Sequence, residues 1–481
     1  MHIHVVAVSG TGMGSLAGLL KELGHEVSGS DVSFDPPMGP ALKEWGVRCL
    51  AGFDAAHLEP KPDLVVIGNV CRPNNVEARA AIDSGLPYTH IAGALARFVL
   101  ADTSPLVVAG THGKTTTTAM AAHLLDRTGF APGFLVGGLP RSFPRSFRAA
   151  GPRRLPTPET RGRKRPFVIE GDEYDTAFFE KTAKFLHYQP EVAILTSIEH
   201  DHIDIYPSLA AYLEAFERFV ALVPEHGLVV ANAADPLVRR VVEKARAEVT
   251  FFALDGEDTG GVAPHWLGAP ALSGETGTAF DLFAGGMLAG RFATALPGRH
   301  NVKNALAAVA AAAQGYGARL SDLGPALASF EGVRRRQELL GTPRQIRVYD
   351  DFAHHPTAVR ETLEALRARH PQGRLIAVFE PRSATACRKL HQNEYPSAFA
   401  AADYVLLAPL GRTNLTADEM LDLERVVSDI QSSGKHAERC PNLDTLSARV
   451  KELAQPFDTV ALLSNGAFGG LPQRLATELA S

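Results

Sequence analysis

A glycine-rich loop within residues 107–118 has the residue types that bind phosphate. The segment reads Val-Val-Ala-Gly-Thr-His-Gly-Lys-Thr-Thr-Thr-Thr: an apolar run, a loop and the start of a helix. Such a loop directs backbone N–H groups and the positive end of a helix at phosphate, while Lys114 supplies a counter-charge and Thr115 a hydroxyl for Mg²⁺. The full phosphate-loop pattern has a glycine where this chain has Val108. The sequence predicts a nucleotide site with a shortened loop, and an incidental glycine turn is the alternative.

Two acidic segments that follow apolar runs supply candidate metal ligands. They are Glu170-Gly-Asp-Glu-Tyr-Asp175 and Glu199-His-Asp-His-Ile-Asp204. A carboxylate at a strand end beside a phosphate loop commonly holds Mg²⁺ on nucleotide phosphates. Acids and imidazoles packed this densely need a cation or hydrogen bonds to organise them. We expect magnesium, because no cysteine or third histidine has zinc spacing; solvated acidic turns are the alternative.

Polar loops in the second half of the chain predict further contacts to the nucleotide and a site for a second substrate. The amides of Gly298-Arg-His-Asn-Val-Lys-Asn304 can contact an adenine edge or cap a helix. The arginines at 334–336 suit phosphate charge, or form an exposed basic turn. Three further loops, at 350–356, 380–383 and 464–470, follow apolar runs, where open α/β sheets bind ligands. They predict a site for a polar co-substrate.

The N-terminal glycines predict a ligand of the nucleotide-diphosphate type. Gly10, Gly12 and Gly14 follow the first apolar run, and Asp31 ends the second, near the spacing of a ribose-binding acid. The third glycine of the dinucleotide pattern is replaced by Ser15. The pattern therefore favours a diphosphate more than NAD, and a tight strand–helix turn is the alternative.

Alternating apolar runs and amphipathic segments position these loops. A chain of 481 residues is expected to contain about three domains. We predict α/β architecture with mostly parallel sheets: a Rossmann-like domain at 1–103, a P-loop ATPase-like domain at 104–341 and a second Rossmann-like domain at 342–481. Residues 101–105 are predicted to be a linker. Residues 149–165, rich in proline, arginine and lysine, are predicted to be a surface insertion or, less favoured, a basic substrate patch.

Composition excludes several classes of protein. The net charge of −5 gives no basic field for nucleic acid or anionic membranes. The four cysteines are scattered and are expected to be reduced. No apolar segment is long enough to cross a bilayer, and the first residues do not form a signal peptide. We expect a cytoplasmic protein that is a monomer or a weak dimer.

The order of these motifs resembles the Mur ligase family, the ATP-dependent amide-forming enzymes of peptidoglycan metabolism. The resemblance extends over essentially the whole chain. Residues 170–179, together with Lys184-Phe-Leu-His-Tyr188 and Glu380-Pro-Arg-Ser383, are most similar to the branch that couples UDP-N-acetylmuramate to the tripeptide L-alanyl-γ-D-glutamyl-meso-diaminopimelate in murein recycling. The resemblance implies that ATP and Mg²⁺ convert the lactyl carboxylate into an acyl phosphate, which the tripeptide amine then attacks.

The resemblance also implies a role for each matched residue. Lys114, Glu173 and His202 would be catalytic, and Thr115, Glu173 and His202 would hold metal. ATP would contact Gly110, Thr111, His112, Gly113, Lys114, Thr115, Thr116, Asn301, Arg336, Asp351 and His354. The UDP-sugar would contact Gly10, Thr11, Gly12, Met13, Gly14, Ser15 and Asp31. The peptide is expected at Arg382, Ser383, Asn465 and Gly466.

One departure and three alternative functions stand beside this interpretation. Ser197 occupies a position where family members commonly have asparagine. The nearest alternative is a ligase that attaches L-alanine instead of the tripeptide. An NAD-dependent oxidoreductase would use the first β-α-β unit but neither the phosphate loop nor the acidic segments. A non-catalytic, ATP-gated binding module would keep Lys114 and Thr115 but has no use for His202 and its acidic neighbours.

Overall fold

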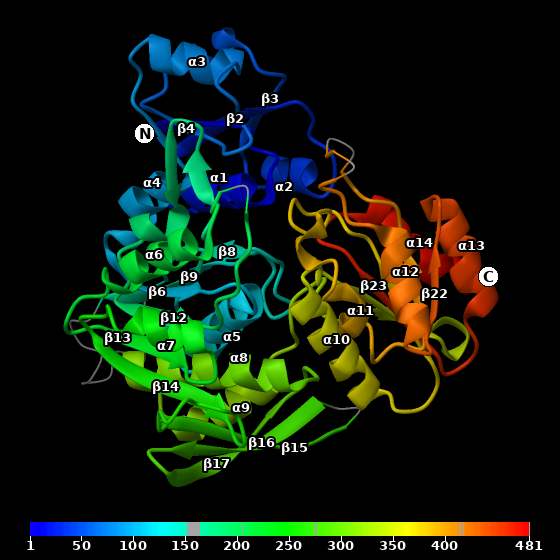
Figure 1. The fold of residues 1–481 in the computed structure, drawn as a ribbon. Coiled ribbons are helices and arrows are strands. Elements are labelled where there is room, and N and C mark those ends of the chain that lie inside the picture. The colour runs from blue at the N-terminus through cyan, green and yellow to red at the C-terminus, as the bar shows by residue number, and fades with distance from the viewer. Residues whose placement is uncertain (152–163, 204, 275–276, 413–414, 417, 481) are drawn as a thin grey trace.

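Three large sheets follow one another along the chain, and a two-stranded hairpin forms a fourth, small sheet. A computed structural model describes residues 1–151, 164–203, 205–274, 277–412, 415–416 and 418–480. Figure 1 shows the N-terminal residues (blue) above the central ones (cyan to green), with the C-terminal residues (yellow to red) beside them. Asp204 and most of the predicted insertion, residues 152–163, lie outside the described residues.

The N-terminal sheet has five parallel strands in the order β3-β2-β1-β4-β5. The turn after β1 leads into α1, so the glycine-rich segment lies at the carboxyl end of the sheet, where such sheets bind ligands. The elements are β1 (His2–Val6), α1 (Thr11–Glu22), β2 (Glu26–Asp31), α2 (Met38–Glu44), β3 (Arg48–Ala51), η1 (Ala55–Leu58), β4 (Leu64–Ile67), α3 (Val76–Asp83), β5 (Tyr88–His90), α4 (Ile91–Leu95) and η2 (Ala96–Leu100).

The central sheet has ten strands in the order β17-β16-β15-β14-β13-β12-β6-β9-β7-β8. Its middle strands are apolar throughout because helices cover both faces, with α5 and α8 on one side and α6 and α7 on the other. The elements before α6 are β6 (Thr103–Ala109), α5 (Lys114–Arg127), β7 (Gly133–Leu135), β8 (Phe147–Arg148), β9 (Arg165–Gly171), β10 (Asp175–Ala177), β11 (Glu180–Ala183), η4 (Lys184–His187) and β12 (Val192–Leu195).

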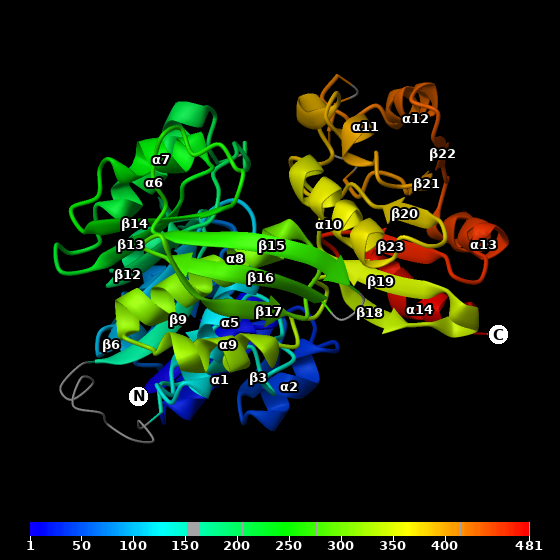
Figure 2. The same cartoon turned by 90° about the horizontal axis from the view of Figure 1, so that it is seen from below.

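The second half of this domain ends in an antiparallel extension. Strands β15, β16 and β17 pair antiparallel, and β15 reaches α10 of the C-terminal domain (Figure 2). The elements are α6 (Leu209–Val220), β13 (Leu228–Asn232), α7 (Pro236–Val242), β14 (Glu248–Leu254), β15 (Trp266–Gly274), β16 (Gly277–Ala284), β17 (Met287–Thr294), α8 (Arg299–Ala310), η5 (Ala311–Gly315) and α9 (Leu320–Ala328).

The C-terminal sheet has six strands in the order β18-β19-β23-β20-β21-β22, and only β18 runs antiparallel. The elements are β18 (Glu338–Gly341), η6 (Pro343–Gln345), β19 (Arg347–Asp351), α10 (Pro356–Arg369), β20 (Leu375–Phe379), η7 (Lys389–His391), α11 (Tyr395–Ala398), β21 (Tyr404–Leu407), α12 (Leu423–Ser432), β22 (His436–Arg439), α13 (Leu443–Leu453), β23 (Thr459–Leu463), η8 (Phe468–Gly470) and α14 (Leu471–Glu478).

The predicted three-part α/β architecture is confirmed, with local corrections. The predicted linker 101–105 overlaps β6, which begins at Thr103 because β6 pairs with β9 from that residue onward. We propose domain boundaries near residue 103 and, since β18 belongs to the third sheet, just before Glu338. The four cysteines are unpaired. Among the described residues, no helix has the length and apolar character needed to cross a membrane.

His370, at the end of α10, predicts acid sensitivity of the C-terminal domain. Burial, together with the charges of Arg347 and Arg369, lowers its pKa to about 4. The unfolded chain takes up this proton below pH ~6.5, so stability that is present above pH 6.5 is lost as the pH falls toward 4. The loss is on the order of 2 kcal/mol.

A His370→Gln variant stays neutral in both states and can still contact the Tyr349 hydroxyl, which lies 2.9 Å from His370 Nε2. Its free energy of unfolding, measured by urea denaturation, should therefore fall less between pH 7 and pH 4.5 than that of the wild type. Equal losses in the two proteins would contradict this assignment.

Candidate active site

The phosphate loop between β6 and α5 requires glycine at two positions. Gly110 has φ +132° and Gly113 has φ +79°. A β-carbon on Gly110 would lie 2.2 Å from Thr196 Oγ1, and one on Gly113 would lie 2.5 Å from Asn304 Oδ1. Ser197 supports the loop, because its carbonyl accepts the Thr111 N–H (2.8 Å) and its hydroxyl accepts the His112 N–H (3.2 Å). Ser197 therefore supports the loop through both its backbone carbonyl and its side chain.

Lys114, Glu173 and His202 form a buried charged cluster. Lys114 Nζ lies 3.1 Å from Glu173 Oε1 and 2.9 Å from Oε2, and His202 Nε2 lies 3.2 Å from Oε1. Glu173 is fully buried. Burial opposes its ionisation, but Lys114 and His202 outweigh burial and lower its pKa. Burial likewise opposes a charge on His202, but Glu173 and Asp201 raise the pKa of the imidazole. The three predicted catalytic residues are therefore brought together.

Thr115 lies beside a different acid from the one predicted. Its hydroxyl donates to Glu170 Oε2 (3.1 Å) and accepts from Arg336 Nη2 (3.0 Å). Glu170 Oε1 also accepts the Gly137 N–H at 2.5 Å. Glu170 ends β9 and points at Thr115, whereas Glu173 lies farther along and faces Lys114. The two carboxylates therefore occupy neighbouring positions around the loop.

These residues fit a magnesium ion. Burial outweighs the nearby cations and raises the pKa of Glu170, so its carboxylate lacks full charge compensation. A divalent cation beside it would supply that compensation. The hydroxyl of Thr115 and the two carboxylates are the hard oxygen donors that Mg²⁺ prefers. The predicted set of Thr115, Glu173 and His202 lacks Glu170, which the structure adds.

The C-terminal domain contacts the acidic segment after β12. Thr357 Oγ1 donates to Glu199 Oε1 (3.0 Å), and Thr385 Oγ1 donates to Asp201 Oδ1 (2.6 Å). Glu199 Oε2 also lies 2.8 Å from His112 Nε2 and 3.3 Å from His355 Nδ1. We call the two hydroxyl–carboxylate bonds the threonine contacts. They join the loop after β12 to the first turn of α10 and to the loop after β20.

A cavity of about 480 Å³ lies where the three domains meet. The N-terminal domain supplies Thr11 and Gly12, and the C-terminal domain supplies Ser383 and Asn465 among others. The predicted ATP residues that line the cavity are Thr111, His112, Gly113, Lys114, Thr115, Thr116, Asn301, Arg336, Asp351 and His354. A second cavity of about 410 Å³ shares His112, Gly113 and Asn304 with it. Residues predicted to contact the nucleotide, the sugar nucleotide and the peptide therefore line one space.

Comparison with known proteins decides the family. Models described as the Mur ligase family catalytic domain, the Mur ligase middle domain and the Mur ligase glutamate ligase domain match residues 2–103, 108–312 and 335–466. UDP-N-acetylmuramate–L-alanyl-γ-D-glutamyl-meso-2,6-diaminoheptandioate ligase of Escherichia coli K12 is 38% identical over 481 residues, which cover 100% of this chain and 98% of that protein. The chain belongs to the Mur ligase family. It is therefore an ATP-dependent enzyme that forms an amide bond.

Two further relatives of this Mur ligase span its full length. UDP-N-acetylmuramate–L-alanine ligase of Rubrobacter xylanophilus is 35% identical over 482 residues, covering 100% of both chains. The crystal structure of a murein peptide ligase from Psychrobacter arcticus superposes with a TM-score of 0.73 at 34% identity, covering 100% of this chain and 99% of that one. The family resemblance inferred from the motifs is confirmed.

The predicted sugar-binding turn of the Mur ligase only partly faces the cavity. Thr11 and Gly12 line it, but Met13, Gly14 and Ser15 are buried. A β-carbon on Gly14 would lie 2.3 Å from Met38 Sδ, and Ser15 Oγ lies 2.9 Å from Ser146 Oγ of the central domain. The Asp31 carboxylate accepts the N–H groups of Ser9 and Val32, and Gly10 is exposed at the start of α1. These residues shape the turn and its contact with the central domain.

The predicted peptide residues lie at two strand ends of the ligase, after β20 and after β23. Ser383 and Asn465 line the cavity. The stem of Arg382 lies across Gly411 and Gly466, since a β-carbon there would approach its side chain to 2.8 Å and 2.3 Å. The guanidinium is 48% exposed, and its salt bridge to Glu380 is long at 3.9 Å. Gly411 and Gly466 thus leave room for an accessible cation next to Ser383, which lines the cavity.

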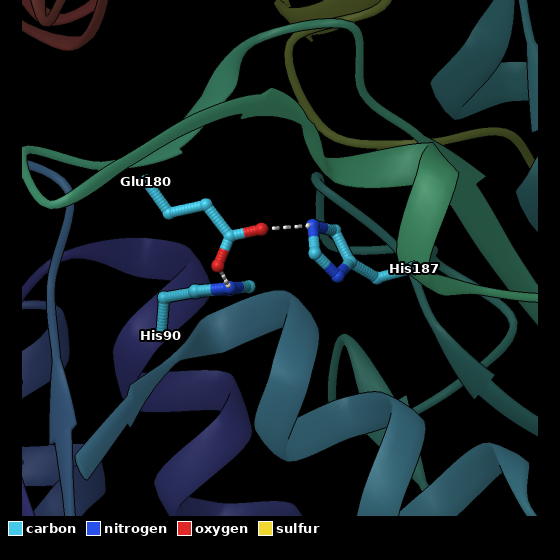
Figure 3. A group of neighbouring side chains, drawn as sticks. All are labelled: His90, Glu180 and His187. Atoms are coloured by element: carbon cyan, nitrogen blue, oxygen red, sulfur yellow. Dashed lines mark hydrogen bonds and ion pairs between the residues drawn. The ribbon is translucent and has the colours of Figure 1, made fainter.

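Among the described residues, two groups of two histidines and a glutamate lie at domain boundaries. One is His112, Glu199 and His355, described above; the motifs did not predict the other, His90, Glu180 and His187. Figure 3 shows Glu180 between His90 of the N-terminal domain and His187 of η4, at 3.0 Å and 3.3 Å. The Gly93 N–H donates to His90 Nδ1 (3.1 Å), so the neutral ring carries its proton on Nε2, facing Glu180. That nitrogen has no lone pair to offer a metal ion. The cluster therefore joins two domains by hydrogen bonds.

Proposed function

We propose that this ligase joins UDP-N-acetylmuramate to the tripeptide L-alanyl-γ-D-glutamyl-meso-diaminopimelate, with ATP and Mg²⁺, in murein recycling. The full-length similarity to the E. coli and P. arcticus enzymes supports this proposal. The observation that carries it is the cavity, which puts the phosphate loop, the N-terminal turn and the peptide-facing strand ends around one space. A phosphoryl donor, an acid and an amine can meet only in such a shared site.

The first step would transfer the γ-phosphoryl group of ATP to the lactyl carboxylate. A carboxylate oxygen forms the new P–O bond, and ADP leaves as the β–γ bridge breaks. Lys114 would neutralise the β and γ phosphates, and Arg336 would contact them from beside Thr115. Mg²⁺, held by Thr115, Glu170 and Glu173 with His202 alongside, would shield the charge that accumulates in the transfer. Asn301, Asp351 and His354 would hold the nucleotide.

The second step would form the amide bond. The free amine of the tripeptide attacks the activated carbonyl carbon, the new C–N bond forms, and phosphate leaves as the C–O bond breaks while the amine loses its proton. Phosphoryl activation is needed because a carboxylate is a poor electrophile. The chain then contributes mainly position and charge. The residues Thr11 and Gly12 would place the sugar nucleotide at the opposite wall of the cavity from the peptide.

Arg382 supports the tripeptide over L-alanine as the acceptor. L-alanine presents one carboxylate, whereas the tripeptide presents three, and a guanidinium binds carboxylates in a two-pronged geometry. Arg382 is accessible and only weakly paired within the described residues. The second candidate function is L-alanine ligation, which the full-length similarity to the R. xylanophilus enzyme favours.

Comparing the two acceptors separates these functions. With UDP-N-acetylmuramate, ATP and Mg²⁺ fixed, we expect kcat/KM for ADP release to be roughly a thousandfold higher with the tripeptide than with L-alanine, because a site built for charged groups rejects ligands that lack them. An Arg382→Met variant should lose most of that preference, while Arg412→Met on the neighbouring loop should keep it. Equal turnover of L-alanine by the wild type would refute the tripeptide assignment.

A further inference from the structure

Three permanently charged cations line the main cavity among the described residues, and the proposed reaction uses only two. They are Lys114, Arg336 and Lys184. Lys114 lies at the end of the phosphate loop and contacts the Gly110 carbonyl. Arg336 donates to the hydroxyl of Thr115, the next residue. Lys184 begins η4, directly after the β10–β11 hairpin, and has no role so far. The function of the Lys184 ammonium group in the cavity is therefore still to be explained.

Lys184 lies on the wall of the cavity that faces the N-terminal domain. The η4 segment packs against α4, whose residues Ile91 and Leu95 line the same cavity. Thr11 and Gly12, from the predicted sugar-nucleotide turn, also line the cavity, and a β-carbon on Gly12 would lie 3.4 Å from Ile91 Cδ1 of α4. The cation therefore lies between the N-terminal turn and the Lys114 cluster.

Asp172 holds the Lys184 ammonium in place. Lys184 Nζ lies 2.6 Å from Asp172 Oδ2, and the lysine side chain is only 16% exposed. An ammonium has three N–H donors, and Asp172 accepts one of them. The anchored cation thus retains donors for an anion in the cavity.

We propose that Lys184 binds the lactyl carboxylate of the sugar nucleotide and holds it beside the γ-phosphate of ATP. This inference rests on the proposed function. A carboxylate that approaches a triphosphate meets strong repulsion between like charges, particularly where the site is partly shielded from water. A cation on the far side of the carboxylate offsets that repulsion and fixes one oxygen for attack. Asp172 acts as the positioning residue, because it orients Lys184.

A ligand pair tests the contact directly. UDP-N-acetylmuramate and UDP-N-acetylglucosamine differ by the lactyl group, so only the first presents the carboxylate. We expect Lys184→Met to weaken binding of UDP-N-acetylmuramate by roughly ten- to a hundredfold and to leave binding of UDP-N-acetylglucosamine within about twofold. Both dissociation constants are measured by calorimetry on the full chain without ATP.

Two variants sharpen the comparison. Lys184→Arg keeps a cation and should recover much of the lost affinity for UDP-N-acetylmuramate. Lys181→Met is the matched control, since Lys181 lies on the hairpin just before Lys184, with its side chain 73% exposed and its ammonium 3.7 Å from Asp175. It should leave both ligands unaffected.

Three outcomes would count against the inference. An equal loss for both sugar nucleotides would mean that Lys184 only shapes the wall and would overturn it. A raised KM for the tripeptide with unchanged binding of UDP-N-acetylmuramate would also overturn it. If the wild type bound neither sugar nucleotide, both this inference and the proposed function would be refuted. If the wild type bound UDP-N-acetylmuramate and ligated it, but Lys184→Met showed no selective loss, only this inference would be refuted.

Discussion

A Lys114→Met variant of this Mur ligase is expected to lose ADP release by roughly a thousandfold or more, because it removes the cation that faces the transferring phosphoryl group. Methionine keeps most of the length of the side chain and removes the charge. Lys114 Nζ is held by the Gly110 carbonyl at 2.5 Å and by Glu173 at 2.9 Å, so its charge has a fixed place beside the loop. The measurement is single-turnover ADP formation at saturating ATP, UDP-N-acetylmuramate and tripeptide.

Folding must be separated from catalysis in this variant. Losing Lys114 leaves Glu173 buried without its main partner, and breaking a buried pair in this way costs about 3–5 kcal/mol of stability. Thermal unfolding and calorimetric binding of UDP-N-acetylmuramate should therefore accompany the kinetics, and the sugar nucleotide should still bind. Turnover within tenfold of the wild type in a folded variant would refute the role given to Lys114.

The second large effect is expected for Glu173→Gln. The amide keeps the shape of the side chain but removes the charge that faces Lys114 and His202. We expect kcat for ADP release to fall by roughly 100- to 1000-fold, and the Mg²⁺ concentration that gives half-maximal activity to rise about tenfold. The shift in the magnesium requirement distinguishes loss of a metal ligand from a general loss of packing.

Glu180→Gln provides the matched control for Glu173→Gln. Glu180 lies seven residues later in the same region, is 40% exposed and bonds histidines outside the main cavity. Its replacement should change kcat by less than about fivefold and leave the magnesium requirement unchanged. An unchanged magnesium dependence in Glu173→Gln would exclude Glu173 as a metal ligand.

The sequence predicted the strand-end loops well, for a physical reason. Apolar runs such as that of β6 are buried on both faces, and polar residues that follow them must lie at one edge of a parallel sheet. Lys114 and Thr115 were located in this way, as were the acidic segments. The antiparallel strands β15–β17 were missed because glycine, alanine and threonine weaken their apolar alternation, and the β10–β11 hairpin was missed because its strands have only three and four residues.

Contacts between distant segments could not be predicted from the sequence. The spacing of Glu170 and Glu173 places both acids after one strand, but only the fold shows that Glu170 faces Thr115 and Glu173 faces Lys114. Ser15 looked like a defective third glycine, yet it bonds Ser146, 131 residues away. The role of such residues depends on how domains pack, which local patterns do not encode.

The threonine contacts have a consequence for the working cycle of the ligase. Thr357 and Thr385 are neutral donors, and each hydrogen bond to a carboxylate contributes on the order of 1–2 kcal/mol. Two such bonds hold the C-terminal domain in place without locking it. Ion pairs weaken as electrolyte is added, whereas a hydroxyl carries no net charge to be screened. Opening of the threonine contacts therefore depends on temperature and hardly on ionic strength, unlike the Arg141–Glu338 and Arg335–Asp350 ion pairs that join the same two domains.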